Sequence, residues 1–374
     1  MYNTLILTQE IGYLDSKTHE VKGNRSCYLI EEEHRKLGHH AKQLRISDCA
    51  IIHGDFYYCG IPFDIKPYQA VVVRTWGDAV QKKKALGEIM PLLVREGLYP
   101  DNSLEAILST ADKKKMQAVI DATGATCPRS LVIDGNNSIE EVRAFIKTLS
   151  AVFTSKSLSA DYPAYVVKPD SGTHGNGVTM FFLGQEHELL EYIHSLKESC
   201  IVQEYIKPVF VLAAQQKGEA CSAHYRIIMS RQSNNALVMI GGLSLQRTGS
   251  WVSNTHCLNG ALYKCILRPE DVAKEVLESL ASIANKIQLS QFGADVIIDD
   301  SGSAFILELN DGMGISGELL EAQQIPAQYV RSHMVRLSDV LKPRVSDLLS
   351  LQGIYATAKP QTTPQNPVAI MSPR

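Results

Sequence analysis

A lysine followed by closely spaced glycines is the first feature of this sequence that could bind phosphate. The stretch YVVKPDSGTHGNGV (165–178) places Lys168 at the end of an apolar run and glycines at 172, 175 and 177. A lysine and the backbone N–H groups of a Gly-rich loop both attract phosphate oxygens. Common nucleotide fingerprints place such a loop at the start of a helix, whereas the GVTMFF that follows here is β-branched, aromatic and apolar. The pattern therefore indicates a phosphate-binding loop between two strands.

Two carboxylates and an amide form a second group that could do chemistry. The segment FGADVIIDDSGSAFILELNDGMGISG (292–317) contains two apolar runs joined by DDSG, a typical turn sequence. A hairpin centred on the serine and glycine of that turn places Asp295 opposite Glu308 and puts Asn310 on the same face. The other face carries apolar residues that we expect in the core: Val296, Ile298, Phe305, Leu307 and Leu309.

The facing carboxylates predict a metal site. Facing β-carbons lie ~5 Å apart, and like charges at that separation destabilise a sheet. A divalent cation would reverse the sign of this interaction, and the hard oxygens of Asp, Glu and Asn suit Mg²⁺ rather than zinc. Since Mg²⁺ usually binds one or two carboxylates together with substrate phosphates, we expect a phosphate beside it. The alternative is an ordinary hairpin with a wet outer face.

The composition of the whole chain limits its class. The 374 residues are enough for two or three domains with their own cores. A net charge of −3 gives no global positive field for nucleic acid or anionic membranes. We see neither a basic secretory leader nor an apolar stretch of membrane-spanning length. The eight cysteines include no CxxC pair, which favours reduced thiols and a cytoplasmic protein.

The elements that must position these groups begin with alternating strand and helix patterns. The expected elements are buried strands at 3–8 and 70–75, a helix that starts at 26 and ends near Gly38, and a helix at 78–97. This alternation is typical of an α/β domain with a parallel sheet, which binds ligands at the carboxyl ends of its strands. Arg74 and Trp76 lie at such an end. They are candidates for a ligand site, the alternative being a solvated loop.

A second unit begins near residue 109. Ser109 or Thr110 is expected to cap a helix that ends at Gly124, and Ser138 to cap a helix over 137–153. The remaining expected elements are a strand after Pro128, a helix at 186–199, a strand at 200–206, and strands over 222–310 around a helix at 269–287. The Pro/Thr/Gln-rich end of the chain is expected to be disordered.

Together these features resemble the ATP-grasp superfamily of carboxylate–amine ligases. Within it, the chain looks most like the branch with glutathione synthetase, the ribosomal-protein glutamate ligase and D-alanine–D-alanine ligase. The resemblance covers about residues 105–320 and rests on the order and spacing of several motifs. It implies an α/β (α+β) fold in which two α+β subdomains clasp ATP. The implied divisions are a Rossmann-like pre-ATP-grasp domain at 1–105, a small subdomain with the Gly-rich loop at 106–205, a large subdomain with the metal hairpin at 206–325, a helical segment at 326–354 and a disordered tail at 355–374.

The resemblance assigns roles to the polar residues already described. Lys113 in ADKKKM matches the family's first ATP lysine, the alternative being a solvated helix face. Lys168 matches the second, which contacts the α- and β-phosphates and adenine. Asp295, Glu308 and Asn310 match the family's magnesium ligands, including their 13- and 2-residue spacings.

The stretch VQEYI (202–206) matches the strand that binds adenine. The backbone of Glu204 and Tyr205 is expected to hydrogen-bond the adenine edge, and Ile206 to pack on the ring. Further nucleotide contacts implied by the resemblance are Ser171, Gly172, Thr173, His174, Gly175, Gly177, Gln203, Glu219 and Leu307.

Two more residues are implied to act on the reacting groups. Arg226 in HYRIIM matches an arginine directed at the transferred phosphate or its acyl product, the alternative being a surface arginine. Asn254 matches a loop asparagine that helps to hold phosphate and acceptor. With Lys168, these two form the expected catalytic group. The family's ribose-binding acid is missing at its usual spacing, with Glu219 as the substitute, and SAHYR replaces the acid before the arginine. These departures leave the subfamily and substrate open.

The resemblance thus implies an enzyme that uses ATP and Mg²⁺, with Mn²⁺ as an alternative. A carboxylate is activated as an acyl phosphate, ADP leaves, and an amine attacks to give an amide or peptide bond. The expected partners are small carboxylate and amine substrates, such as amino acids or peptides, and neither nucleic acid nor membrane. Homodimers are frequent among relatives, so a homodimer is one expectation. The alternatives are a ligase acting on a protein or peptide end and a non-catalytic ATP-binding module.

Overall fold

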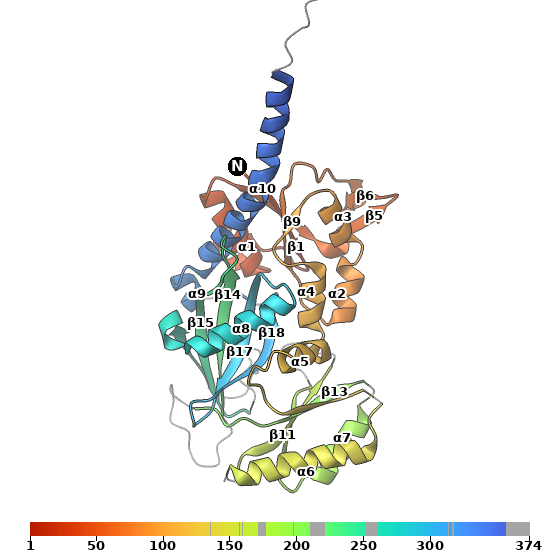
Figure 1. Ribbon diagram of the computed structural model, residues 1–374, viewed down its shortest axis with the longest axis vertical. Helices are drawn as coiled ribbons and strands as arrows, with labels where there is room; N and C mark the ends of the chain where they lie inside the picture. The colour runs from red at the N-terminus through yellow and green to blue at the C-terminus, as the bar shows by residue number, and fades with distance from the viewer. Residues whose placement is uncertain are drawn as a thin grey trace, which may run out of the picture.

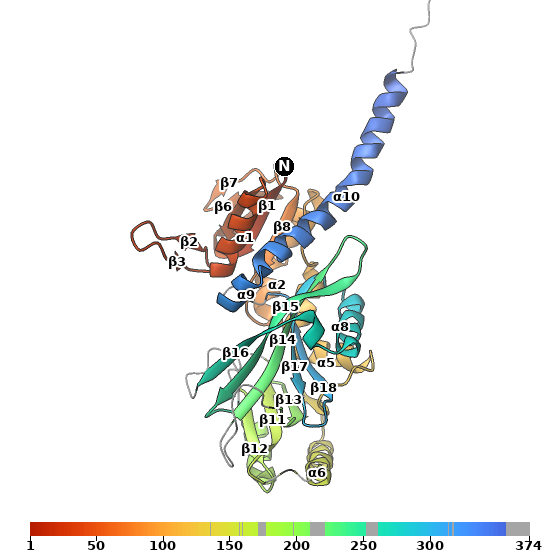
Figure 2. The same cartoon turned by 90° about the vertical axis from the view of Figure 1, so that its left-hand side faces the viewer.

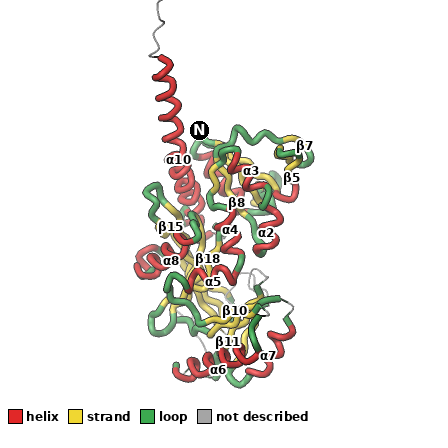
Figure 3. The backbone as a smooth tube through the Cα atoms, turned by 45° about the vertical axis from the view of Figure 1, so that its right-hand side comes forward, coloured by secondary structure: helices red, strands yellow, loops and turns green. Residues whose placement is uncertain are grey.

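The structure of the protein is a computed structural model (Figure 1). It describes residues 1–134, 136–156, 158, 160–170, 177–196, 198–209, 221–251, 261–312, 314–315 and 318–356, with side chains as far as residue 341. Three larger sheets follow one another along the chain, with helices packed on their faces (Figures 1 and 3). Within the described residues, we find no helix that combines the length and the apolar character needed to cross a membrane.

The first sheet has four parallel strands in the order β4-β1-β8-β9. They are β1 (Asn3–Thr8), β4 (His40–Arg45), β8 (Ala70–Arg74) and β9 (Tyr99–Pro100). The predicted buried strands at the positions of β1 and β8 are confirmed. Leu5 and Leu7 face one hydrophobic core and Ile6 faces another, because successive side chains of a strand point to opposite faces. Since both faces are covered, the strands read as uninterrupted apolar runs.

Helices cover both faces of this sheet. On the Ile6 face lie α1 (Arg25–Lys36) and the first part of α10 (Ile325–Ala356). On the other face lie α2 (Ala79–Leu86), α3 (Ile89–Arg95) and α4 (Leu104–Ala111). The single helix predicted at 78–97 is therefore two helices, because Pro91 has no N–H to donate and is tolerated only in a first helical turn. Smaller elements complete this part: β2 (Tyr13–Leu14), β3 (Val21–Lys22), the 3₁₀ turn η1 (Ile46–Asp48), β5 (Cys49–Ile52), β6 (Asp55–Tyr58) and β7 (Ile61–Pro62).

A short helix pair leads to the second sheet. A single residue separates α4 from α5 (Lys113–Asp121). The prediction that Ser109 or Thr110 caps α5 is wrong, because both lie inside α4. Asp112 is the cap instead, and its side chain accepts a hydrogen bond of 2.9 Å from the N–H of Lys115. Aspartate caps helices as well as serine does.

The second sheet has four antiparallel strands in the order β10-β13-β11-β12. They are β10 (Ser130–Ile133), β11 (Pro163–Pro169), β12 (Thr179–Phe182) and β13 (Cys200–Glu204). The helices α6 (Ile139–Ser155) and α7 (Glu186–Ser195) pack on one face around Tyr165 and Val202. Ser138 caps α6 as predicted, and Glu141 completes a reciprocal capping box.

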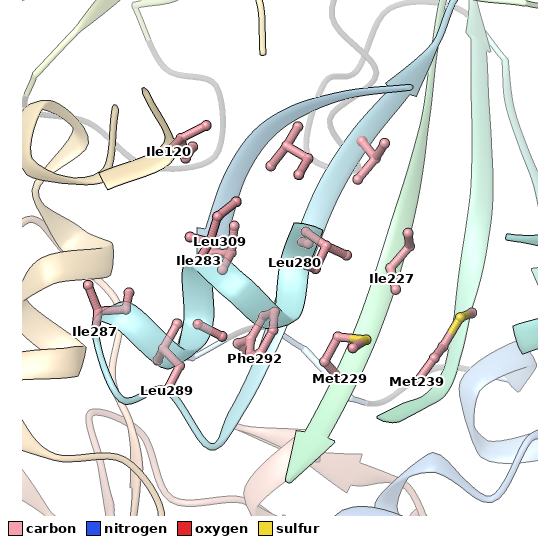
Figure 4. Close-up of a cluster of buried hydrophobic side chains, with 14 of the residues drawn as sticks. Ile120, Ile227, Met229, Met239, Leu280, Ile283, Ile287, Leu289, Phe292 and Leu309 are labelled. Atoms are coloured by element: carbon pink, nitrogen blue, oxygen red, sulfur yellow. The ribbon is translucent and has the colours of Figure 1, made fainter. Parts of the chain in front are cut away.

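The third sheet has five antiparallel strands in the order β16-β15-β14-β17-β18. They are β14 (Cys221–Arg231), β15 (Leu237–Thr248), β16 (Leu262–Leu267), β17 (Gln291–Ile298) and β18 (Ala304–Asn310). The 3₁₀ turn η2 (Pro269–Asp271) and α8 (Lys274–Lys286) follow β16. Figure 4 shows Leu280 and Ile283 of α8 against Phe292 and Leu309 of the sheet. This core fixes the two strands that carry the predicted metal ligands.

The last helices return to the first sheet. After α9 (Glu318–Ala322), α10 runs beside α1 and then extends away from the sheets (Figures 1 and 2). Its bounds agree with the helix predicted at 326–354. The predicted domain divisions after residues 105, 205 and 325 stay predictions. The strands of the three sheets occupy separate parts of the sequence: the first sheet ends at Pro100, the second begins at Ser130 and the third begins at Cys221.

Candidate functional site

A cavity of about 730 Å³ has walls from all three sheets. It brings together most of the predicted site residues that the structure describes: Lys113, Lys168, Gln203, Glu204, Tyr205, Ile206, Arg226, Asp295, Leu307, Glu308 and Asn310. Gly177 is described and lies outside the cavity wall. The other predicted residues lie outside the described part of the chain: Ser171, Gly172, Thr173, His174, Gly175, Glu219 and Asn254.

The hairpin β17–β18 carries two facing carboxylates in this wall. Asp295 pairs directly with Glu308, as the turn sequence predicts. The register then shifts at a β-bulge next to Asp295, where Leu307 is the extra residue. The bulge places Ile306, which is 2% exposed, in the core, while Leu307 lines the cavity. The prediction of Leu307 as a core residue is therefore wrong, because an extra residue exchanges the two faces of a strand.

The same bulge changes the exposure of the residues near the turn. Val296 and Leu309 are buried, as predicted. Ile298 and Phe305 are only half-buried, and the ammonium of Lys156 lies 5.7 Å from the centre of the Phe305 ring. The prediction of Phe305 in the core is wrong for the same reason, because Phe305 lies on the bulged strand β18, between the bulge and the turn. Ile298 lies on β17, which has no extra residue, and it is half-buried because it pairs at the end of the hairpin next to the turn.

Arg226 on β14 holds the carboxylate of Asp295. Its Nε donates to Oδ1 and its Nη2 donates to Oδ2, each at 2.9 Å. Such bidentate pairs combine charge with fixed geometry. Burial raises the pKa of Asp295, but Arg226 and the nearby His224 outweigh it and lower that pKa to about 2. Burial lowers the pKa of His224 to about 4. At neutral pH, Asp295 is therefore a carboxylate and His224 is neutral.

Two lysines face the carboxylates from the second sheet and α5. Burial lowers the pKa of Lys168, while Glu308 and Asp295 oppose this effect. Burial also lowers the pKa of Lys113, and Glu308 is again the first group that opposes it. Lys113 Nζ donates to the carbonyl of Pro169 at 2.5 Å, directly after Lys168 in the sequence. The two lysines, Arg226 and the carboxylates therefore share one small volume.

The donor atoms of the hairpin fit a hard divalent cation. Asp295 and Glu308 are directly opposite each other on paired strands, so their side chains lie on the same face of the hairpin. Asn310 Nδ2 donates to Glu308 Oε1 at 2.9 Å, which leaves the amide oxygen of Asn310 for another partner. Carboxylate and amide oxygens are the ligands that Mg²⁺ prefers. Within the described residues, no cluster of three or more His, Cys, Asp or Glu side chains could hold a metal ion, so the fit rests on this pair and its amide.

The end of β13 and the residues that follow it also line the cavity. The N–H of Glu204 donates to the carbonyl of Arg129 at 2.9 Å, and the N–H of Tyr205 donates to the carbonyl of Ala164 at 3.2 Å. These two N–H groups are therefore engaged by the chain itself. A nucleobase would have to use a carbonyl of this strand or the N–H of Ile206, for which no backbone partner is found in the described residues.

Aromatic rings close this end of the cavity. Trp251, just after β15, lies 6.0 Å from Tyr205, 5.9 Å from Tyr162 and 6.1 Å from Phe182, measured between ring centres. Trp251 and Tyr205 line the cavity, and the other two rings are not among the residues that line it. The flat apolar surface of Trp251 is therefore available to a planar ring.

The sequence reasoning missed a buried ion pair in the same wall. Lys82 Nζ lies 2.6 Å from Asp311 Oδ1, and the Thr110 hydroxyl donates to the same oxygen at 2.8 Å. All three residues line the cavity. Asp311 directly follows the predicted metal ligand Asn310, which is the one signal that could have drawn attention to it.

The comparisons with known proteins bear on the class of the chain. No protein-family model matches it. Among curated proteins, it is 25% identical over 297 residues to a probable alpha-L-glutamate ligase of Xylella fastidiosa (strain M12). This match covers 78% of the chain and 85% of the relative.

Solved structures of ATP-grasp ligases have the same fold. The ligase PsnB, complexed with a minimal precursor, superposes with a TM-score of 0.56 at 14% identity and covers 88% of this chain and 100% of its own. The D-Ala:D-Ser ligase VanG from Enterococcus faecalis has a TM-score of 0.57 at 12% identity, with 90% and 100% covered. The macrocyclase MdnC from Microcystis aeruginosa, bound to its precursor peptide, has a TM-score of 0.56 at 15% identity, with 88% and 99% covered.

These likenesses show that the chain has the predicted ATP-grasp fold, and they agree with the predicted class of ATP-dependent ligase. The curated relative is named as a glutamate ligase and VanG as a D-Ala:D-Ser ligase. The structures of PsnB and MdnC are complexes with a precursor.

Proposed function

We propose that this ligase uses Mg²⁺ and ATP to join the carboxylate of an amino acid or small peptide to an amine, through an acyl phosphate. The observation that carries the proposal is the facing pair Asp295 and Glu308, with Lys113, Lys168 and Arg226 around it in one cavity. Three cations around two carboxylates leave a surplus of positive charge. A bound triphosphate with its metal ion would neutralise that surplus.

Each charged residue has a task in this proposal. Lys113 and Lys168 bind phosphate oxygens, and their half-buried positions strengthen that attraction because little water screens it. Asp295 fixes the Arg226 guanidinium, which offsets the negative charge on the transferred phosphoryl group. Mg²⁺, or Mn²⁺ in its place, would be held by Asp295, Glu308 and Asn310 and would neutralise charge on the phosphates.

The reaction needs positioning rather than a protein nucleophile. A carboxylate oxygen of the donor attacks the γ-phosphorus, the bond to the β–γ bridging oxygen breaks, and ADP leaves. The amine nitrogen then attacks the acyl carbon, the bond from this carbon to the phosphate oxygen breaks, and the nitrogen loses a proton to solvent. The products are an amide, ADP and phosphate.

Several relatives support this substrate class. The curated relative is named as an alpha-L-glutamate ligase. Another structure of PsnB contains a phosphomimetic variant of its precursor together with Mg and ADP. Because two structural neighbours hold precursor peptides, a ligase that modifies a protein or peptide end is our second candidate.

The test is ADP and phosphate release with purified protein, Mg·ATP and a panel of amino-acid pairs and short peptides. We expect release that depends on both a carboxylate and an amine. Glu308→Gln should abolish it, while the same substitution at Glu278, an exposed residue of α8, should not. Full turnover by Glu308→Gln would overturn the metal assignment. Binding of Mg·ATP without release for any pair would instead indicate a non-catalytic ATP-binding module.

A further inference from the structure

The first sheet contributes a separate group of side chains to the cavity. β8 ends at Arg74, and the turn of residues 75–78 before α2 lines the cavity together with Glu10. Trp76 in this turn is 44% exposed. A large aromatic side chain left exposed in a cavity wall is typical of a binding site.

Three hydrogen bonds and one close backbone approach hold this turn in place. The N–H of Trp76 donates to Oε1 of Gln9 at 3.0 Å, and Nε2 of Gln9 donates back to the carbonyl of Trp76 at 2.9 Å. Asp78 caps α2 through a hydrogen bond of 2.8 Å from a backbone N–H of its first turn. Gly312 packs so closely that a β-carbon there would lie 2.6 Å from the carbonyl oxygen of Thr75. The turn is therefore preorganised, which reduces the entropy lost when a ligand binds.

The charges at this end favour a cationic ligand. Lys82 is paired with Asp311, and Arg74 is only 3% exposed. Glu10 and Asp78 line the cavity, and neither forms an ion pair with any residue that the structure describes. Lys113 interacts electrostatically with Asp78, so these two carboxylates face one cation and leave a net negative charge among these residues.

The hydroxyl of Thr75 gives an independent sign of a ligand. Thr75 is 3% exposed and lines the cavity, and its Oγ1 has no hydrogen-bond partner among the described residues. Buried polar groups are nearly always hydrogen-bonded in native proteins, so a ligand donor is expected to satisfy it.

We propose that Trp76, Glu10, Asp78 and Thr75 bind the ammonium group of the amine substrate, and that Trp76 helps to determine which amine is accepted. Ammonium groups bind both to carboxylates and to the face of an indole ring, and Thr75 Oγ1 accepts a hydrogen bond from one of the N–H groups. Because only the neutral amine can attack the acyl carbon, the bound ammonium first loses one proton to solvent, and the nitrogen loses a second proton when the amide forms. The inference rests on the proposed ligase function. The subsite also adjoins the phosphate-binding end, because Asp78 is among the carboxylates that oppose the burial-lowered pKa of Lys113.

The two tryptophans of the chain allow a direct test, because Trp76 and Trp251 line the same cavity from different sheets. Trp251→Phe keeps only Trp76 as a fluorophore, and Trp76→Phe keeps only Trp251. The probes are alaninamide, phenylalaninamide and lysinamide, which carry an ammonium and no carboxylate. The matched probes are the N-acetyl amino acids, which carry a carboxylate and no ammonium.

We expect the amides to change Trp76 fluorescence with saturation and the N-acetyl amino acids to leave it unchanged. Adding Glu10→Gln and Asp78→Asn should weaken amide binding on the order of ten-fold. Asparagine keeps the helix cap at position 78, and Glu10 is exposed, so an unchanged melting temperature serves as the folding control.

Other outcomes would overturn the inference. A Trp76 signal from the N-acetyl amino acids but not from the amides would identify a carboxylate site. No amide response up to 0.1 M, or full binding by the double charge variant, would exclude an ammonium site. Mg·ATP titrated against Trp251 in Trp76→Phe reports separately on the nucleotide end, so failure there would count against the proposed ligase function instead.

Discussion

Replacing Lys82 with methionine tests the buried ion pair that joins the first sheet to the metal hairpin. Lys82 Nζ lies 2.6 Å from Asp311 Oδ1, and the side chains are 6% and 3% exposed. Without the lysine, Asp311 would keep only the hydroxyl of Thr110, because its Oδ2 has no hydrogen-bond partner in the described residues. Removing one partner of a buried pair costs about 3–5 kcal/mol, because a charge remains in a site that water cannot reach. At about 2 °C per kcal/mol, the melting temperature should fall by roughly 6–10 °C.

The assay is thermal unfolding followed by circular dichroism, with Lys83→Met on the exposed side of the same helix as the matched control. Lys83→Met should change the melting temperature by less than about 1 °C, since surface charges contribute little. The double variant Lys82→Met, Asp311→Leu removes both charges and should recover most of the loss. The reasoning is refuted if Lys82→Met melts like Lys83→Met, or if the double variant is as unstable as the sum of the single ones.

Three further predictions follow from the site and the core. Burial, with His39 nearby, lowers the pKa of His34 from 6.5 to about 4, so the unfolded chain takes up a proton first as the pH falls. Between pH 6.5 and 4, the free energy of unfolding measured by denaturant titration should fall by about 3 kcal/mol less in His34→Leu than in the wild type. The same pH dependence of the unfolding free energy in both proteins would contradict this. Arg226→Met should raise the pKa of Asp295 well above its present value of about 2 and add an acidic limb to the pH profile of Mg·ATP binding; an unchanged profile would show that Arg226 does not set this charge. Gly312→Ala should lower the affinity for amino-acid amides and the melting temperature together, because its β-carbon would meet the carbonyl of Thr75 at 2.6 Å; wild-type values for both would refute that close approach.

The sequence alone predicts those features that depend on local patterns. The turn DDSG and the alternating strands around it fix the pairing of Asp295 with Glu308, and the order of motifs predicts the ATP-grasp fold. The β-bulge that turns Leu307 into the cavity was not predictable in the same way. The bulge adds one residue to an apolar run. With or without this residue, both faces of the strand carry apolar side chains, so the hydrophobic pattern does not reveal the bulge.

The buried charges were also beyond local reasoning. Lys82 occurs in the run QKKKA, which has the pattern of a solvated helix face, and its partner Asp311 lies 229 residues further along the chain. Only tertiary packing brings them together. The pairing of the Glu204 and Tyr205 N–H groups with chain carbonyls likewise depends on neighbouring strands. The predicted homodimer and the roles of the site residues stay predictions.

The path of α10 has a consequence for how the chain folds during its synthesis. Ile325, Tyr329 and Val330 complete the core that contains Ile6 and Ile30. A ribosome makes β1 and α1 early and α10 last, so the part of this sheet face that α10 covers stays exposed until nearly the whole polypeptide has emerged. We expect nascent chains that stop before residue 325 to bind chaperones or aggregate, because exposed apolar surface on incomplete chains does both.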